Sequence, residues 1–102
     1  MAGRVKRKVP ANAVHPGEIL REEFMAPLEL TSAELARHLR VSVPRVNDIV
    51  RHRRAITADT AMRLARYFGT SAKLWMGLQT EYELNLAAAN REIAKIKPRE
   101  AA

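Results

Sequence analysis

Apolar residues recur every three or four positions along most of the 102-residue chain, which is the spacing of one face of an α-helix. No segment alternates apolar and polar residues between turn signals, as a half-buried strand would. The pattern predicts an all-α fold, built as a bundle of five or six helices. A chain of this length supports one core, so we expect a single domain over residues 15–96, with a flexible basic segment at 1–14 and a tail at 97–102.

The first predicted helix begins at Pro16, because proline is tolerated in a first turn, and Pro27 ends it near Met25. Glu18 lies near the positive end of the helix dipole, where a carboxylate is favourable. The residues expected to face the core are Ile19, Leu20, Phe24 and Leu28.

Two short helices joined by a tight turn are predicted next. Thr31 and Glu34 form a capping box for a helix that runs to about Leu39, and Ser42 caps a helix over Val43–Val50. Helices this close must cross tightly, which requires small and apolar residues at fixed places. This arrangement is the helix-turn-helix, which presents its later helix to the DNA major groove. Its expected inward cluster is Leu35, Ala36, Leu39, Val41, Val46 and Ile49.

Two further helices are predicted towards the C-terminus. Thr57 caps the first of them and Gly69 is its left-handed stop, while Ser71 starts the second. An apolar stripe in the second helix continues to Pro98, too long for so small a core to bury. Either the helix breaks near Gly77, or its end packs on another subunit. The stripe contains Trp75, Leu78, Tyr82, Leu86, Ala89, Ile93 and Ile96.

The excess length of this stripe favours a homodimer. We expect Trp75 and Leu78 to belong to the core. Two-fold pairing would set the recognition helices about 34 Å apart, which matches a palindromic site with half-sites one helical turn apart. The residues predicted at the dimer interface are Tyr82, Leu86, Ala89 and Ile93.

The formal net charge of +7 is unevenly distributed. Four cations lie between Arg4 and Lys8, where solubility is the simplest role, with a minor-groove, RNA or toxin contact as alternatives. Six arginines against one aspartate lie between residues 37 and 54. A solvated charged face accounts for Arg21 or Arg63, but a merely solubilising surface would be expected to mix in lysine. The guanidinium fork binds phosphate and guanine edges bidentately, so this group favours a double-stranded DNA partner.

The helical wheel turns one face of the 43–50 helix away from the core. Arg45 matches the guanine edge, with a phosphate contact or an ion pair with Asp48 as equal alternatives. Asn47 matches adenine, and Val43 matches a thymine methyl group. Asp48 either accepts from cytosine or orients a neighbouring arginine, Arg45 or Arg51. The predicted base contacts are Val43, Arg45, Asn47, Asp48 and Arg51.

Helix ends and the loop after the recognition helix supply polar residues that reach the sugar-phosphate strands, where contacts position the protein. If six cations each neutralise one phosphate, the slope of log affinity against log salt is about −5 per subunit. The predicted phosphate contacts are Thr31, Ser32, Arg37, His38, Arg40, Ser42, His52, Arg53 and Arg54.

Three ordered segments carry a family resemblance: HPGEILREEF at 15–24, ITADTAMRLARYFGTS at 56–71, and then Trp75, Leu78, Gln79 and Tyr82. Over residues 15–88 the chain resembles the HigA-type antitoxins of the xenobiotic-response-element (XRE) helix-turn-helix class. The resemblance implies a lambda-repressor-like DNA-binding fold. It also implies a bacterial dimer that represses its own operon and neutralises a HigB-type toxin, a ribosome-dependent mRNA endonuclease.

Two positions depart from the family pattern. Arg40 stands where the family usually has glycine in the turn, and a non-glycine residue in a left-handed turn costs about 1 kcal/mol. Arg51-His52-Arg53 stands where the family commonly has Asn-Gly followed by Lys or Arg. We expect a strained or reshaped turn, stronger backbone contact and an altered sequence preference.

Other functional classes have weaker support. The three histidines form no His-x-x-x-His pair, and the chain has neither a glycine-rich phosphate loop nor a serine nucleophile elbow, so we expect no catalysis, no metal site and no cofactor. A stand-alone repressor without a toxin and a scaffold that does not bind DNA are the remaining alternatives. Zero cysteines and no apolar run of the roughly 18 residues that a membrane span requires indicate a cytoplasmic protein.

Overall fold

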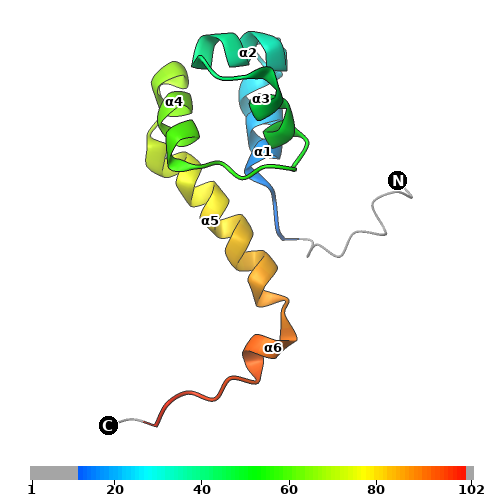
Figure 1. The fold of residues 1–102 in the computed structure, drawn as a ribbon, viewed down its shortest axis with the longest axis vertical. Helices are drawn as coiled ribbons and strands as arrows, with labels where there is room; N and C mark the ends of the chain where they lie inside the picture. The colour runs from blue at the N-terminus through cyan, green and yellow to red at the C-terminus, as the bar shows by residue number, and fades with distance from the viewer. Residues whose placement is uncertain (1–11, 101–102) are drawn as a thin grey trace, which may run out of the picture.

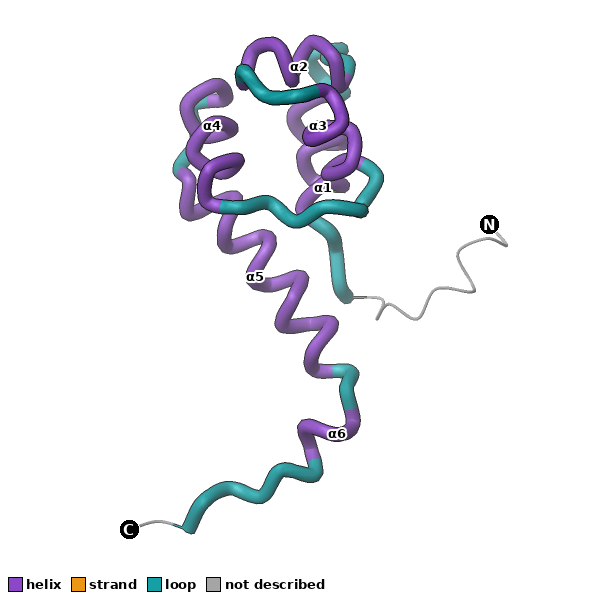
Figure 2. The backbone as a smooth tube through the Cα atoms, viewed as in Figure 1, coloured by secondary structure: helices purple, strands orange, loops and turns teal. Residues whose placement is uncertain are grey.

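The computed structural model describes residues 12–100, which fold into helices and loops without a strand, as Figure 2 shows. The predicted all-α architecture is confirmed for this part of the chain. Four short helices and the first half of a longer one form a compact head, and the rest of the long helix projects from it towards the C-terminus (Figure 1). The basic residues Arg4–Lys8 lie outside the described residues.

The first helical segment consists of two types of helix in succession. A single α-helical turn, α1 (Pro16–Ile19), leads into the π-helical segment η2 (Leu20–Met25). The amide of Ala26 donates to the carbonyl oxygen of Arg21 over 2.9 Å, which is the i to i+5 bond of a π-helix. The helix ends at Met25, as the proline two residues later predicts.

The predicted inward position of Leu28 is wrong. Leu28 lies in the turn after η2 and is 60% exposed. The chain reverses at Glu29, whose φ of 54° is left-handed, and Leu30 packs against the core instead. The prediction extended the helical pattern past Pro27, but the helix ends at Met25, so Leu28 does not lie on a helix face.

The helix-turn-helix has the predicted boundaries. It consists of α2 (Ser32–Leu39) and α3 (Val43–Val50). The Thr31 hydroxyl accepts from the amide of Glu34 over 3.1 Å, and the Glu34 carboxylate accepts from the amide of Thr31 over 2.9 Å. These bonds complete the predicted capping box and hold the pKa of Glu34 below its usual range. Ser42 caps α3 through the amide of Arg45.

Helix α4 (Ala58–Phe68) lies beside the helix-turn-helix, packs against α2 and ends at Gly69, where φ is 73° (Figure 1). Its Thr57 cap and its glycine stop are as predicted. Helix α5 (Ala72–Ala88) then starts at the Ser71 cap and packs against α4. The core that these elements enclose includes the fully buried Leu20, Leu35, Ala36, Val46, Ile49, Ile56, Ala61, Leu64 and Trp75.

Helix α5 runs through Gly77 without interruption, so the first of the two alternatives, a break near that residue, does not occur. The break lies at Asn90, whose side chain caps the short α6 (Arg91–Ala94). An added Cβ at Gly77 would meet no atom within 4 Å, which shows that this glycine sits on an open helix face. Within residues 12–100, no helix has the length and apolarity needed to cross a membrane.

The predicted dimer residues divide into two pairs. Tyr82 and Leu86 are half-buried, and the Tyr82 ring contacts His15 edge-on with centroids 4.8 Å apart. Ala89 and Ile93 are exposed at the end of α5 and in α6, and Leu84 and Ile96 are exposed as well. Tyr82 and Leu86 are therefore partly covered within the protomer. Ala89 and Ile93 lie on the segment that projects from the head, the end of α5 together with α6, which we call the projecting arm.

Candidate nucleic-acid interface

Helix α3 packs through Val46 and Ile49 and turns its other face outwards. Val43 is 44% exposed and Arg51 is exposed, whereas Arg45, Asn47 and Asp48 are half-buried. The five residues predicted to contact bases therefore lie outside the core of the head. These residues differ in the hydrogen bonds and ion pairs that they make with neighbouring side chains.

Arg45 is bound to α4. Its Nη1 donates to Oδ2 of Asp59 over 2.8 Å and to the hydroxyl of Thr60 over 3.5 Å. The predicted alternative, an ion pair between Arg45 and Asp48, does not form. Asp48 instead faces Arg54, with Nη2 and Oδ2 3.6 Å apart, so it orients neither of the arginines predicted for it. Helix α3 is thus linked to α4 through Arg45 and to the loop after α3 through Asp48.

Asp59 also joins α4 to the turn of the helix-turn-helix. The same Oδ2 atom accepts from Nε of Arg63 over 2.8 Å, and Nη1 of Arg63 donates to the carbonyl oxygens of Leu39 and Arg40 over 2.8 and 3.3 Å. Hydrogen bonds from Arg63 and Arg45 hold the pKa of Asp59 below its usual range. Arg63, which the charge pattern assigned to a solvated face, therefore supports the carbonyl end of α2.

Arg40 adopts the left-handed conformation that glycine usually provides, with φ 61° and ψ 45°. The turn is therefore strained rather than reshaped. The amide of Val41 donates to the carbonyl of Ala36 over 3.0 Å, which closes the turn after α2. His52 repeats this pattern after α3, with φ 65°. Both family glycine positions thus keep the glycine backbone with a larger side chain.

The other end of α3 meets α1 through a direct backbone contact. A Cβ on Gly17 would overlap the carbonyl oxygen of Ile49 and lie 2.8 Å from its carbonyl carbon. Only glycine permits this approach. The buried His15 caps α1 by accepting from the amide of Gly17 at Nδ1 over 2.8 Å. The His-Pro-Gly segment therefore locates the C-terminal end of the recognition helix.

The ring of His15 stacks on that of His52, with centroids 4.7 Å apart and planes inclined by 10°. Burial, with a smaller contribution from the charge of His52, lowers the pKa of His15 to about 4. Sequence reasoning placed His52 at the surface among the phosphate contacts, and the structure shows it half-buried against His15. These residues are 37 positions apart, so no local spacing indicates the pair.

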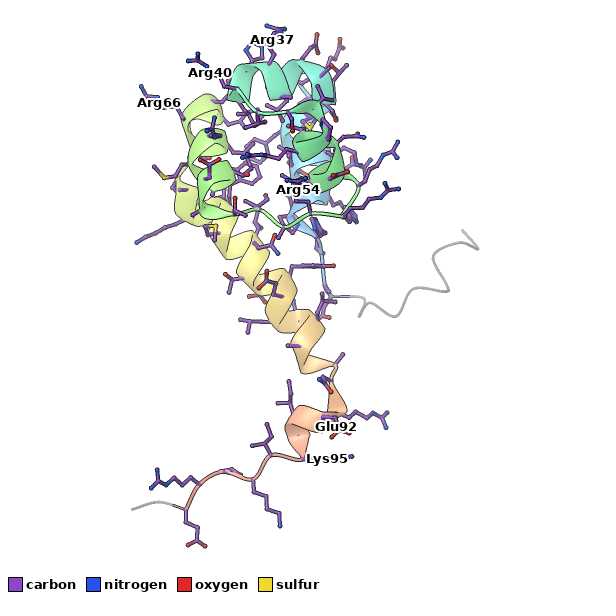
Figure 3. All side chains as sticks on the ribbon, viewed as in Figure 1. Arg37, Arg40, Arg54, Arg66, Glu92 and Lys95 are labelled. Atoms are coloured by element: carbon purple, nitrogen blue, oxygen red, sulfur yellow. The ribbon has the colours of Figure 1, made fainter. Side chains whose placement is uncertain are left out.

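The predicted phosphate contacts fall into two groups around α3. Arg37 and Arg40 project from the end of α2 that meets α4, next to Arg66, whereas Arg54 lies over the loop after α3 (Figure 3). At the opposite end of α2, the capping box engages Thr31, while Ser32 lines a cleft of about 690 Å³ beside α3. The polar residues of that cleft are Arg21, Ser32, Asn47, Arg51, His52 and Arg53.

Three positioning residues escaped the sequence analysis: His15, Asp59 and Arg63. Their roles depend on partners far along the chain, so helical periodicity gives no sign of them. The only local signals are His15 before Pro16 at a helix start, and the i, i+4 spacing of Asp59 and Arg63, which permits an ion pair. Within residues 12–100, no group of three or more histidine, aspartate or glutamate side chains is placed to hold a metal ion.

Comparison with known proteins identifies relatives of this chain. Residues 20–75 match a family model described as helix-turn-helix. Virulence-associated protein I of Dichelobacter nodosus is 50% identical over 89% of this chain and 82% of its own length. An HTH-type transcriptional regulator of Haemophilus influenzae is 37% identical over 80% of each chain.

A solved structure described as Pseudomonas aeruginosa antitoxin HigA with higBA promoter is similar over 85% of this chain and 98% of that one. Its TM-score is 0.80 and its sequence identity 54%. The family model spans the helix-turn-helix with η2, α4 and the start of α5. The chain belongs to the XRE-type helix-turn-helix family that includes the HigA antitoxins.

Proposed function

We propose that this protein is the antitoxin of a type II toxin-antitoxin system. In this role it binds its own operator as a dimer, represses its operon and neutralises a HigB-type mRNA endonuclease in the bacterial cytoplasm. The observation that carries the proposal is the 54% identity to the P. aeruginosa HigA antitoxin, whose structure is described with its promoter. The exposed, arginine-flanked face of α3 is the chemistry that such a role requires.

In this proposal α3 enters the major groove and its outward residues contact bases. The arginines on both sides of it neutralise phosphates, together with the polar groups at the start of α2. The phosphate contacts fix the register of the protein on DNA without reading its sequence. The base contacts are Val43, Arg45, Asn47, Asp48 and Arg51, and the phosphate contacts are Thr31, Ser32, Arg37, His38, Arg40, Ser42, His52, Arg53 and Arg54.

Titration of a promoter fragment with the full chain tests DNA binding. We expect a complex at modest ionic strength and a log–log salt slope of about −5 per subunit. Arg51→Ala should weaken binding, whereas Arg99→Ala, which removes an equal charge from the exposed C-terminal tail, should not. Absence of a complex, or equal affinities for the two variants, would contradict the proposal.

We also propose that the projecting arm forms the dimer interface, through Ala89 and Ile93 together with Tyr82 and Leu86 at its base. The exposed apolar side chains on this arm support the idea, since 49% of Ile93 is accessible in the protomer. Sedimentation of the wild type should give a dimer at micromolar concentration, and Ile93→Asp should shift it towards monomer. A wild-type monomer would remove this part of the proposal.

A stand-alone repressor is the second candidate, because the H. influenzae relative is described as a transcriptional regulator. The two candidate functions use the same DNA-binding face, and only the antitoxin also binds a toxin. A reading frame for a small endonuclease-like protein next to this gene, whose product copurifies with the chain and whose toxicity the chain suppresses, would support the antitoxin. Lack of such a neighbour, with operator binding intact, would favour the repressor.

A further inference from the structure

The guanidinium of Arg45 is held at one side only. Both hydrogen bonds that the described residues make to it involve Nη1, towards Asp59 and Thr60 of α4. A guanidinium carries five N–H donors in one plane, so the Nε and Nη2 edge still has donors to offer. The side chain keeps 31% of its surface exposed. Arg45 is therefore fixed in direction while one edge remains available.

Asp59 is itself held by a second arginine, Arg63. Its Oδ2 accepts from both Arg45 and Arg63 over 2.8 Å, and Arg63 is anchored on the carbonyl oxygen of Leu39. The carboxylate thus lies at the centre of a chain of contacts that begins at the turn of the helix-turn-helix and ends at the recognition helix. The three side chains keep between 31% and 57% of their surface exposed, so this chain of contacts is polar and open to solvent.

We propose that Asp59 is a specificity-determining positioning residue, which acts on DNA through Arg45. Bidentate readout of guanine requires two donors held in one plane, and a guanidinium already tied at Nη1 loses less conformational freedom on meeting the base. Released from Asp59, the long side chain can swing to the nearest phosphate, a contact that carries no sequence information. The carboxylate also repels phosphates, which weakens binding at sites where Arg45 finds no guanine.

This inference rests on the proposed operator binding and deepens it, and the test separates the two. The full chain is titrated at fixed salt with a promoter fragment and with a scrambled fragment of equal length. For Asp59→Ala we expect the ratio of the two affinities to fall about tenfold, the discrimination of one good base contact. Affinity for scrambled DNA should stay equal or rise. Glu92→Ala removes a carboxylate from a comparable exposed pair with Lys95 on α6 and should leave the ratio unchanged.

A double-mutant cycle with Arg45→Ala identifies the route of the effect. In the Arg45→Ala background, Asp59→Ala should leave the ratio unchanged, because the side chain that it positions is absent. Additive effects would overturn the inference. So would equal changes in both affinities, since these indicate a general charge effect or a loss of folded protein, which thermal unfolding of each variant measures. If the wild type does not distinguish promoter from scrambled DNA, the proposed function fails as well.

Discussion

The C-terminal end of α3 meets α1 through a backbone contact at Gly17 and a buried histidine, whereas its N-terminal end meets α4 through charges that remain in contact with solvent. Close packing tolerates almost no change in volume and is hardly affected by salt. Exposed ion pairs tolerate changes in volume, contribute little each and weaken as salt rises. The recognition helix is therefore rigidly located at one end and adjustable at the other, where the guanidinium of Arg45 lies.

The largest effect is expected from adding one methyl group at the packed end. Gly17→Ala would drive Cβ into the carbonyl of Ile49, a backbone atom that no side-chain rotation moves aside. We expect a loss of about 3 kcal/mol in the free energy of unfolding, measured by urea titration, and loss of promoter binding because the end of α3 is displaced.

Gly77→Ala is the matched control, because a Cβ at this position on α5 meets no atom within 4 Å. Alanine is the better helix former, so this variant should be more stable by up to about 1 kcal/mol and should bind the promoter as the wild type does. Similar losses in both variants would show that the contact between α1 and α3 has no special role.

The next largest effect is a loss of stability at low pH, which we expect from the buried His15. The pKa of His15 is about 4 in the folded protein against an ordinary value of 6.5, so the unfolded chain takes up a proton at a pH where the folded one does not. Stability contributed by neutral His15 is complete above pH 6.5 and is lost as the pH falls towards 4, by at most about 3 kcal/mol in total. Urea titrations across this range measure the loss.

His15→Asn keeps a side-chain acceptor for the amide of Gly17 but does not titrate, so its stability should depend less on pH between 6.5 and 4. His38→Gln serves as the control, because His38 is exposed and stacks on Tyr67 at the far end of α2. An unchanged pH dependence in His15→Asn would show that other groups cause the loss.

The sequence revealed the boundaries of α3 but not the contacts at either of its ends. The helix boundaries were predictable because each depends on residues within four positions, as at Thr31, Ser42 and Gly69. The outward face of α3 followed from periodicity alone. The contacts that hold α3 in place were not predictable, because Gly17 and Ile49 are 32 positions apart and the Arg45–Asp59 pair spans 14.

The wrong position of Leu28 and the rejected alternative of a break at Gly77 both come from reasoning on local sequence. Leu28 continues a helical apolar pattern, but the pattern carries no information about the reversal at Glu29. Gly77 has a low helix propensity, yet packing of Trp75 and Gln79 on the head holds α5 together through it. Local propensity is a weak determinant wherever tertiary packing is available.

At the adjustable end we expect a smaller effect. Arg63→Ala removes the donor that links Asp59 to the carbonyls of Leu39 and Arg40, and since 37% of the Arg63 side chain is exposed, the loss in stability should be about 1 kcal/mol. The ion-pair part of this loss should shrink in 1 M salt, where the Debye length is about 3 Å. Thermal melts at low and high salt measure both quantities. A loss as large as that of Gly17→Ala would mean that this end is not adjustable.

The smallest effect is a gain in stability that we expect before α3 but not after it. Arg40 and His52 both hold left-handed backbone without a glycine, so glycine at either position relieves strain of about 1 kcal/mol. Arg40→Gly should therefore gain stability, while losing one phosphate contact and about 0.9 of the salt slope. His52→Gly should show no gain, because it also removes the ring stacked on the buried His15. Equal gains in urea titrations of the two variants would mean that the stack contributes nothing, and that the packed end of α3 relies on Gly17 alone.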